Sequence, residues 1–153
     1  MKKLLVLMFA LAACSSSQSG PSPSPSPDAS GGSSMTGATS SRGAVEQFLA
    51  AVRARDLQAI SVIWGTEKGP ARDQLERTEL EKREIIMQDC LVHDQFRILD
   101  ETTGEGGQRV FRVELTKGAV SATPRFYTVL GPENRWYVLE AEINAARALC
   151  NLP

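Results

Sequence analysis

Apolar residues recur at helical spacing along two adjacent stretches that begin near residue 44. The first stripe repeats every three to four positions and consists of Ala44, Val45, Phe48, Leu49 and Val52. Asp56 follows as an N-cap, which predicts a second helix with Leu57, Ile60, Ile63 and Trp64 on one stripe. A third helix is predicted from about Asp73 to Asp89. It opens with a capping-box-like pattern at Asp73–Glu76, and its interleaved acids and bases favour a solvated face with i,i+4 ion pairs.

After Cys90 the apolar positions alternate, which is typical of strands. Four strands are predicted, at Leu91–Leu99, Arg109–Lys117, Thr123–Leu130 and Arg135–Ala141. The second is the clearest, because Phe111, Val113 and Leu115 share one face. In the last strand, Tyr137, Leu139 and Ala141 are expected on one face, and Trp136, Val138 and Glu140 on the other. Turns are expected at 104–107 and 131–134, and residues 143–149 form either a short helix or a strand extension.

Helices followed by an antiparallel meander predict an α+β fold, in which N-terminal helices pack on a curved four-stranded antiparallel sheet. The folded domain is expected to span residues 44–153. The preceding segment, from Ser15 to Gly43, consists almost throughout of Ser, Pro, Gly, Ala and Thr and contains no aromatic residue. Such a composition cannot bury enough apolar surface to offset its ordering entropy. Residues 14–43 are therefore predicted to be a disordered linker.

The first 13 residues have the pattern of a secretory signal peptide. Met1-Lys2-Lys3 is cationic, and Leu4–Ala13 is a short run of uncharged, mostly apolar residues that ends in small ones. A membrane-spanning helix needs about 20 apolar residues, so this run is too short to be a permanent anchor.

The sequence Leu11-Ala12-Ala13-Cys14 resembles the bacterial lipobox, in which small residues precede an acylated cysteine. The resemblance implies that Cys14 becomes the lipid-modified first residue of a membrane-anchored envelope lipoprotein. Two or three acyl chains, at roughly 0.8 kcal/mol per buried methylene, would hold it on the membrane permanently. In that family an Asp after the cysteine favours retention at the inner membrane. Because Ser15 stands there, the outer membrane is expected if the host has one.

Charge and cysteine content narrow the function classes. Loss of Lys2 and Lys3 leaves 15 of the 17 basic residues against 18 acidic ones, a net charge of about −3 without a basic stripe. A nucleic-acid partner is therefore not expected.

The cysteine count predicts a disulfide. With Cys14 lipidated, Cys90 and Cys150 remain, and in an oxidising envelope they are expected to form a disulfide. The alternative is that they are two buried free thiols. No metal-binding spacing is present, and neither a metal nor a cofactor is expected.

The opening helices also resemble those of nuclear-transport-factor-2-like (SnoaL-like) domains. The resemblance comes from Ala44–Val52, Arg55-Asp56-Leu57 and Ile60–Trp64, and it extends loosely to Asn151. In that family a curved sheet closes over the helices to form a cone with an internal pocket. Its members include isomerases, cyclases, dehydratases and binding modules, and many pair through the open face of the sheet. The resemblance therefore implies a cone and a homodimer, but it selects no activity.

Acid–base groups offer few candidates for catalysis. These are His93, Asp94, Tyr127, Tyr137, Glu140 and Glu142. His93 and Asp94 are adjacent in a predicted strand, so their side chains should point to opposite faces and cannot form a dyad. His93 is expected on the face of Gln95, Arg97 and Leu99. No catalytic residue is therefore assigned.

Aromatic and basic side chains suggest two further arrangements. Trp64, His93, Tyr127 and Trp136 are candidates to line a pocket, although aromatic residues more often lie in a core. Arg97, Arg112 and Arg125 are expected on adjacent strands opposite Glu114, Glu140 and Glu142, as an ionic ladder or an anion pocket.

Two functions remain open. One is a non-catalytic envelope lipoprotein whose domain binds a small ligand, an envelope protein or a second copy of itself. The other is an isomerase or dehydratase acting on a small apolar molecule. A desolvated acid or base inside the domain would favour the second function, and a packed or purely apolar interior the first.

Overall fold

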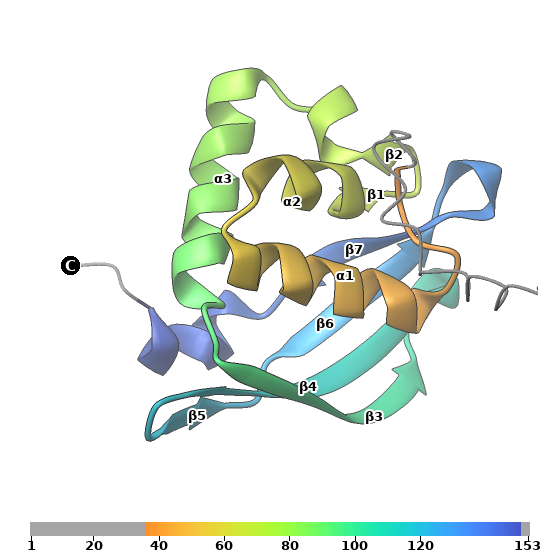
Figure 1. The fold of residues 1–153 in the computed structure, drawn as a ribbon. Coiled ribbons are helices and arrows are strands. Elements are labelled where there is room, and N and C mark those ends of the chain that lie inside the picture. The colour runs from red at the N-terminus through yellow and green to blue at the C-terminus, as the bar shows by residue number, and fades with distance from the viewer. Residues whose placement is uncertain (1–35, 151–153) are drawn as a thin grey trace, which may run out of the picture. The chain divides into compact units, whose positions relative to one another are not determined.

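A computed structural model describes residues 36–150 of the chain, which lie in one compact unit (Figure 1). The predicted signal peptide (1–13), Cys14 and most of the predicted linker lie outside the described residues. Three helices come first: α1 (Ser41–Ala54), α2 (Leu57–Ile63) and α3 (Arg77–Cys90). Between α2 and α3 lies a small hairpin of β1 (Gly65–Thr66) and β2 (Gly69–Pro70). None of the helices within 36–150 has the length and apolar content needed to cross a membrane.

The main sheet is open and antiparallel, with the order β3-β4-β6-β7 and a short β5 paired to β4. Its strands are β3 (Gln95–Thr103), β4 (Arg109–Lys117), β5 (Val120–Ala122), β6 (Arg125–Leu130) and β7 (Trp136–Ala141). The 3₁₀ segment η4 (Ile143–Leu149) follows. The α+β class is therefore present, but the sheet has five strands instead of the four predicted. The prediction missed β5, because three residues are too few to show a period.

The domain begins before the predicted start at Ala44. The side-chain oxygen of Ser40 accepts a hydrogen bond from the Gly43 amide (3.0 Å) and so caps α1. Upstream of this cap, the Ala38 amide donates to the Trp136 carbonyl, and the Trp136 amide donates back, both at 2.8 Å. Ser40 lies in the segment predicted as linker, yet it caps the first helix. Its hydroxyl oxygen accepts a hydrogen bond from an amide that has no partner within the helix.

The helix boundaries confirm one predicted cap and correct another. Asp56 caps α2 by accepting from the Ala59 amide (3.0 Å). Asp73, however, lies in a separate 3₁₀ turn, and α3 begins at Arg77 after Glu76, whose side chain makes no capping bond. The chain turns here because the Gln74 side-chain amide donates to the carbonyls of Gly69 (2.6 Å) and Pro70 (3.2 Å). The hydrophobic spacing does not reveal these contacts, which join a side chain to carbonyls four and five residues earlier.

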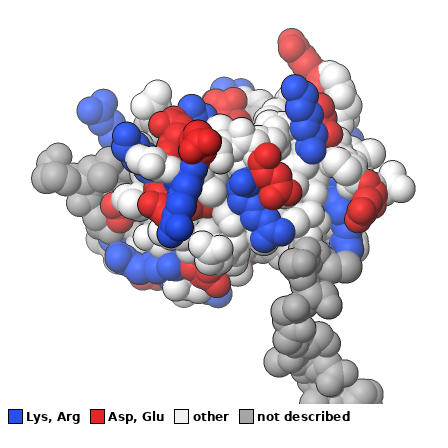
Figure 2. Space-filling view, turned by 90° about the horizontal axis from the view of Figure 1, so that it is seen from above, with Lys and Arg blue, Asp and Glu red and all other residues white. Residues whose placement is uncertain are grey.

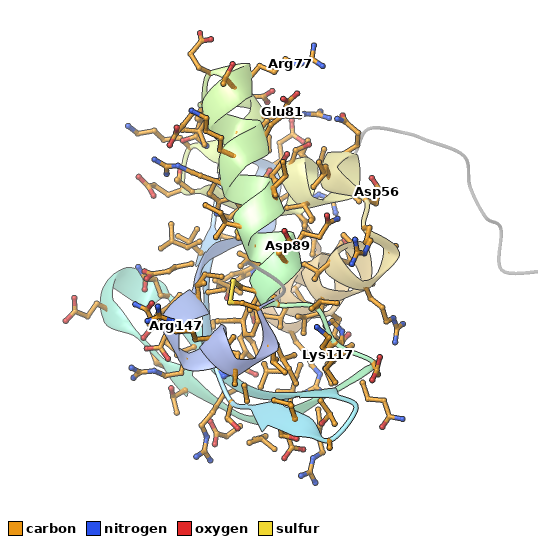
Figure 3. The ribbon with its side chains drawn as sticks, turned by 90° about the vertical axis from the view of Figure 1, so that its left-hand side faces the viewer. Asp56, Arg77, Glu81, Asp89, Lys117 and Arg147 are labelled. Atoms are coloured by element: carbon orange, nitrogen blue, oxygen red, sulfur yellow. A yellow bond between two sulfur atoms is a disulfide. The ribbon has the colours of Figure 1, made fainter. Side chains whose placement is uncertain are left out.

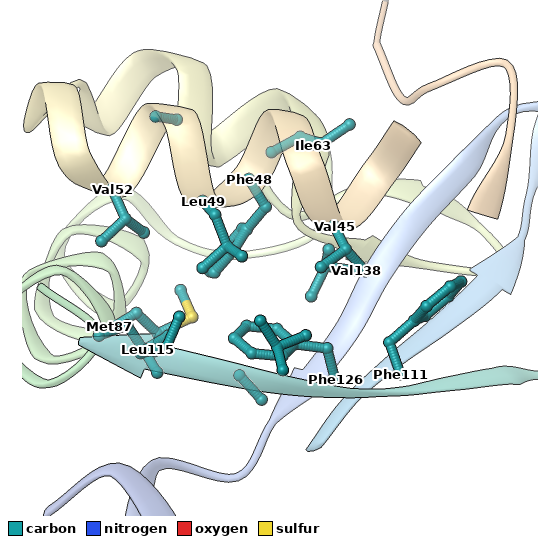
Figure 4. Packing of buried hydrophobic residues seen from close by; sticks show 14 of the residues in the cluster. Val45, Phe48, Leu49, Val52, Ile63, Met87, Phe111, Leu115, Phe126 and Val138 are labelled. Atoms are coloured by element: carbon teal, nitrogen blue, oxygen red, sulfur yellow. The ribbon is translucent and has the colours of Figure 1, made fainter. Parts of the chain in front are cut away.

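The core lies between α1 and one face of the sheet (Figure 4). The apolar stripes predicted from the helical and strand periods are fully buried. They consist of Val45, Phe48, Leu49 and Val52 on α1, and of Phe111, Val113 and Leu115 on β4. Phe48 meets Phe126 of β6 edge to face, with ring centroids 6.1 Å apart. Each such side chain contributes roughly 1.5–3 kcal/mol by leaving water, so this contact layer is the main source of stability.

A β-bulge overturns the predicted faces of β7. Tyr127 pairs with Glu140 and Thr128 with Val138, which leaves Leu139 without a partner residue. The extra residue reverses the alternation, so Val138 and Ala141 both join the core. Tyr137 is buried on the other face instead. Its ring lies against the backbone of Gly37 and Gly131, and its hydroxyl is 3.1 Å from Thr36 Oγ1.

A disulfide joins Cys90, the last residue of α3, to Cys150, which follows η4 (Figure 3). The pairing predicted from the cysteine count is therefore present. The side-chain ammonium of Lys117 also donates to the Leu149 carbonyl (3.3 Å). Together these bonds hold η4 against α3 and the end of β4.

The double variant Cys90→Ala/Cys150→Ala should unfold at a lower temperature than the wild type. The bond spans 60 residues, and on the chain-entropy model a loop of that length stabilises the fold by about 4 kcal/mol. Thermal unfolding measured by circular dichroism tests this. Adding a reductant should lower the wild-type Tm towards that of the variant and leave the variant unchanged. Coincident melting curves without reductant would contradict the role of the bond.

Candidate functional site

The four predicted pocket residues do not line one common site. Trp64 and Trp136 both pack against the core. Trp136 begins β7 and bridges Ala38, and Trp64 bridges Val138 of the same strand. Tyr127 lies on the opposite face of the sheet, where the Arg125 guanidinium is 6.0 Å from its ring centroid. His93 precedes β3. Of the four, Trp64 lines the groove described below.

His93 does not lie in a strand, contrary to prediction. The Leu91 amide still donates to Met87 of α3 (2.9 Å), so the helix is followed by a loop, and β3 begins only at Gln95. His93 is 3% exposed, its Nδ1 lies 2.8 Å from the Leu91 carbonyl oxygen, and its ring packs edge to face on Phe96. Burial lowers the pKa of this imidazole, which favours the neutral ring. We assign it a structural role.

The predicted arginine ladder is present on the outer face of the sheet. Arg97 donates to Glu114 (3.0 Å), Arg112 to Asp100 (2.9 Å) and Arg125 to Glu142 (2.9 Å). The hydrogen bond from Arg125 lowers the pKa of the Glu142 carboxyl. Asp100 was not predicted as a partner, and Glu140 instead pairs across the strands with Tyr127. Because each guanidinium has an acidic neighbour, the ladder is self-neutralised and offers no anion pocket.

A groove with a mostly apolar lining lies between α3 and β7. We call it the α3–β7 groove. It has a volume of about 510 Å³ and is lined by Trp64, Arg83, Ile86, Met87, Leu139, Glu140, Ala141 and Ile143. Volumes of about 300–1,000 Å³ with few polar groups are typical of small-molecule sites. Here Arg83 and Glu140 are the polar exceptions.

Trp64 is fixed in this groove by backbone and side-chain contacts. Its backbone bridges Val138 in parallel, and its indole N–H donates to the Leu139 carbonyl (3.3 Å). The bulge at Leu139 coincides with this contact, on the edge of β7 that faces away from β6. A smaller hollow of about 160 Å³ adjoins the groove, since it shares Trp64, Arg83 and Leu139. Trp64 therefore lies where the two hollows meet.

A second, more polar hollow lies on another side of α3, and we call it the Glu84 cavity. It has a volume of about 390 Å³ and is lined by Gln58, Ser61, Arg72, Leu75, Arg77, Leu80, Glu81 and Glu84. Figure 2 shows Lys and Arg side chains intermixed with Asp and Glu on the upper face. On α3, Arg77 pairs with Glu81 (2.9 Å) and Arg83 with Glu79 (2.6 Å), as predicted for a solvated helix.

Glu84 is a buried ionisable residue that sequence reasoning missed. It was grouped with the solvated acids of α3, yet it is 2% exposed, and its Oε1 lacks a hydrogen-bond partner within residues 36–150. Burial, followed by the negative charge of Glu81, raises its pKa to about 7. A signal was available: Leu80, Glu84, Met87 and Leu91 follow helical spacing, so Glu84 lies on the apolar stripe.

No family model matches the chain, and no curated protein matches its sequence. In the described part of the chain, no group of three or more His, Cys, Asp or Glu side chains is arranged to hold a metal ion. The site must therefore be judged by its own geometry. That geometry offers an apolar groove at Trp64 and a buried carboxyl at Glu84, on different sides of one helix.

Replacing Glu84 by Gln should stabilise the protein more at high pH than at low pH. Because the folded state raises the pKa from 4.5 to about 7, it binds the proton more tightly than the unfolded state. The resulting stabilisation is complete below pH 4.5 and is lost as the pH rises through 7. A neutral Gln avoids this loss, so the stability difference should change by roughly 3 kcal/mol between pH 4 and 8.

Urea unfolding of both proteins across that range measures the effect. Glu79→Gln, which removes a charge from an exposed position of the same helix, is the control. A difference between Glu84→Gln and the wild type that stays constant with pH would contradict the raised pKa.

Proposed function

We propose that this protein is an extracytoplasmic lipoprotein, anchored through Cys14, whose folded domain binds a small apolar molecule in the α3–β7 groove. The groove is the observation on which the binding function rests. Its apolar lining favours a hydrocarbon body, and Arg83 and Glu140 at the same surface favour one polar end. Arg83 is already paired with Glu79, so the polar end need not be fully charged.

The disulfide supports the extracytoplasmic location. Such bonds persist in oxidising compartments and are rare in the cytosol. With Cys90 and Cys150 joined, Cys14 is the third and remaining cysteine of the chain. This agrees with a lipobox in which that one cysteine is modified separately. A linker rich in Ser and Pro would then keep the domain away from the membrane surface.

A nuclear-transport-factor-2-like fold is part of the proposal. Helices that pack on one face of an open antiparallel sheet, with α1 across its centre, support it. In that family the pocket lies inside the cone. In this chain Phe48, Phe126 and Leu115 fill the space between α1 and the sheet and are fully buried. A packed apolar interior favours a binding module over an isomerase or dehydratase. Since the interior is filled, the ligand would bind at the edge of the sheet formed by β7.

Replacing Cys14 by Ser should abolish membrane anchoring through lipid. Without the thiol no thioether forms, and the acyl chains that hold the protein on the membrane are lost. Metabolic labelling with an alkyne fatty acid, together with membrane flotation, measures this. Ser15→Ala, which keeps the cysteine, should be labelled like the wild type. Unchanged labelling of Cys14→Ser would refute the lipoprotein assignment.

A probe with an apolar body and one polar group should bind beside Trp64. In a Trp136→Phe background Trp64 is the sole tryptophan, and anilinonaphthalene sulfonate should quench its emission saturably. Ile86 lines the groove and is 44% exposed, so Ile86→Glu places a charge there without disturbing the core. We expect it to weaken binding by about tenfold or more, equivalent to 1.4 kcal/mol.

Ile85→Glu is the matched control, because Ile85 is 45% exposed and does not line the groove. It should bind the probe as the wild type does. Equal loss of binding in both variants, or no saturable quenching in either, would show that the groove is not the site.

A further inference from the structure

The outward side of α3 carries an apolar pair between two charges of opposite sign. Four residues at the spacing i, i+3, i+4 and i+7 share this side, namely Lys82, Ile85, Ile86 and Asp89. We call it the Ile85–Ile86 face. Glu84 and Met87 are buried on the opposite side of the helix. Figure 1 shows α3 at the border of the domain, so the face is open to a partner.

Ile85 and Ile86 are the one adjacent pair among the large apolar side chains that are exposed within residues 36–150. They are 45% and 44% exposed, and each of the others lies on a different strand: Leu99, Val120 and Leu130. Single exposed apolar side chains are ordinary on a protein surface. A contiguous apolar patch with a polar rim is instead typical of an interaction site.

The charges at the two ends of the face have no partner on the same chain. Elsewhere on α3, Arg77 pairs with Glu81 and Arg83 with Glu79. Lys82 and Asp89 form no ion pair within the described residues. They lie two turns apart, about 10 Å along the helix axis, and so do not pair with each other. Both charges are therefore available to a second molecule.

A twofold axis between Ile85 and Ile86 makes this face complementary to itself. In an isologous dimer one patch serves both copies, so each contact occurs twice with the roles exchanged. Lys82 lies three residues before Ile85, and Asp89 lies three residues after Ile86. With two antiparallel helices, Lys82 of each copy therefore lies opposite Asp89 of the other, and the four isoleucines meet at the centre.

We propose that the Ile85–Ile86 face binds a second copy of this chain, with α3 packed antiparallel on α3. The charges select this orientation, because a parallel pair in register would place Lys82 against Lys82 and Asp89 against Asp89. The face shares only Ile86 with the α3–β7 groove. Self-association and ligand binding can therefore be tested separately, and either can fail without the other.

The size of the face sets the expected affinity. One helix of 14 residues from each copy is about 20 Å long. It buries less than the roughly 1,200–2,000 Å² of a standard interface. We therefore expect a weak, reversible dimer with a Kd of about 10–100 µM.

Sedimentation equilibrium of residues 15–153 tests the proposal. This segment keeps the compact unit, its core and its disulfide, which all lie within residues 36–150. The weight-average mass should rise from that of the monomer towards twice that value between about 5 and 500 µM. A chain that stays monomeric at about 1 mM would overturn the proposal.

Charge reversal tests the face and its orientation together. Lys82→Glu and Asp89→Lys each place a like-charge contact at both ends of the symmetric dimer. Each variant alone should associate about tenfold more weakly or worse. An equimolar mixture should associate like the wild type, because opposite charges then face each other at both ends of the heterodimer. Recovery in the mixture also shows that both variants fold, whereas a mixture no stronger than its components would overturn the antiparallel pairing.

Ile85→Glu tests the apolar centre of the face. It places a carboxylate beside the twofold axis and should abolish the dimer, while the groove probe still binds because Ile85 does not line the groove. Leu130→Glu is the matched control, since Leu130 is 43% exposed and lies on β6. It should associate like the wild type. Undiminished association of Ile85→Glu, or equal loss in both variants, would overturn the proposal.

Discussion

Burial of one apolar face of the antiparallel sheet beneath α1 is the interaction on which the rest of the structure depends. The helix supplies an apolar stripe with a period of 3.6 residues, and β4 supplies one with a period of two. Phe48 and Phe126 meet at its centre. Because this layer fills the interior, α2, α3 and η4 pack at its borders, and the α3–β7 groove forms where α3 meets its edge.

The two edges of the sheet are covered differently, and this difference determines where the groove lies. At β7 the backbone of Ala38 and Trp64 covers the edge, each through an isolated bridge. At β3 the edge has no further strand within the described residues, and a bulge between Ile98 and Asp100 interrupts its register. Bulges and charged side chains of this kind discourage pairing between open edges. Because Trp64 covers the edge of β7, it adds apolar surface beside α3, and this surface forms part of the groove lining.

Helix α3 separates two hollows of unlike chemistry because it has more than one buried side. Ile86 and Met87 border the apolar groove, whereas Leu80 and Glu84 border the polar cavity. Ile86 and Glu84 are two residues apart and therefore lie on nearly opposite sides of the helix, with Met87 between them. One helix thus borders two hollows whose linings share no residue, and its ion pairs Arg77–Glu81 and Arg83–Glu79 are solvent-exposed.

The sequence by itself determined the local structure: the α1 stripe, the Asp56 cap, the alternation of β4 and the ion pairs of α3 depend on spacing alone. Cysteine count sufficed for the pairing of Cys90 with Cys150. Tertiary structure decided the rest. An extra residue at Leu139 reversed the faces of β7, and packing of α2 on α3 buried Glu84 within a charged helix. Strand register and helix contact involve residues distant in sequence, so periodicity along the chain cannot encode them.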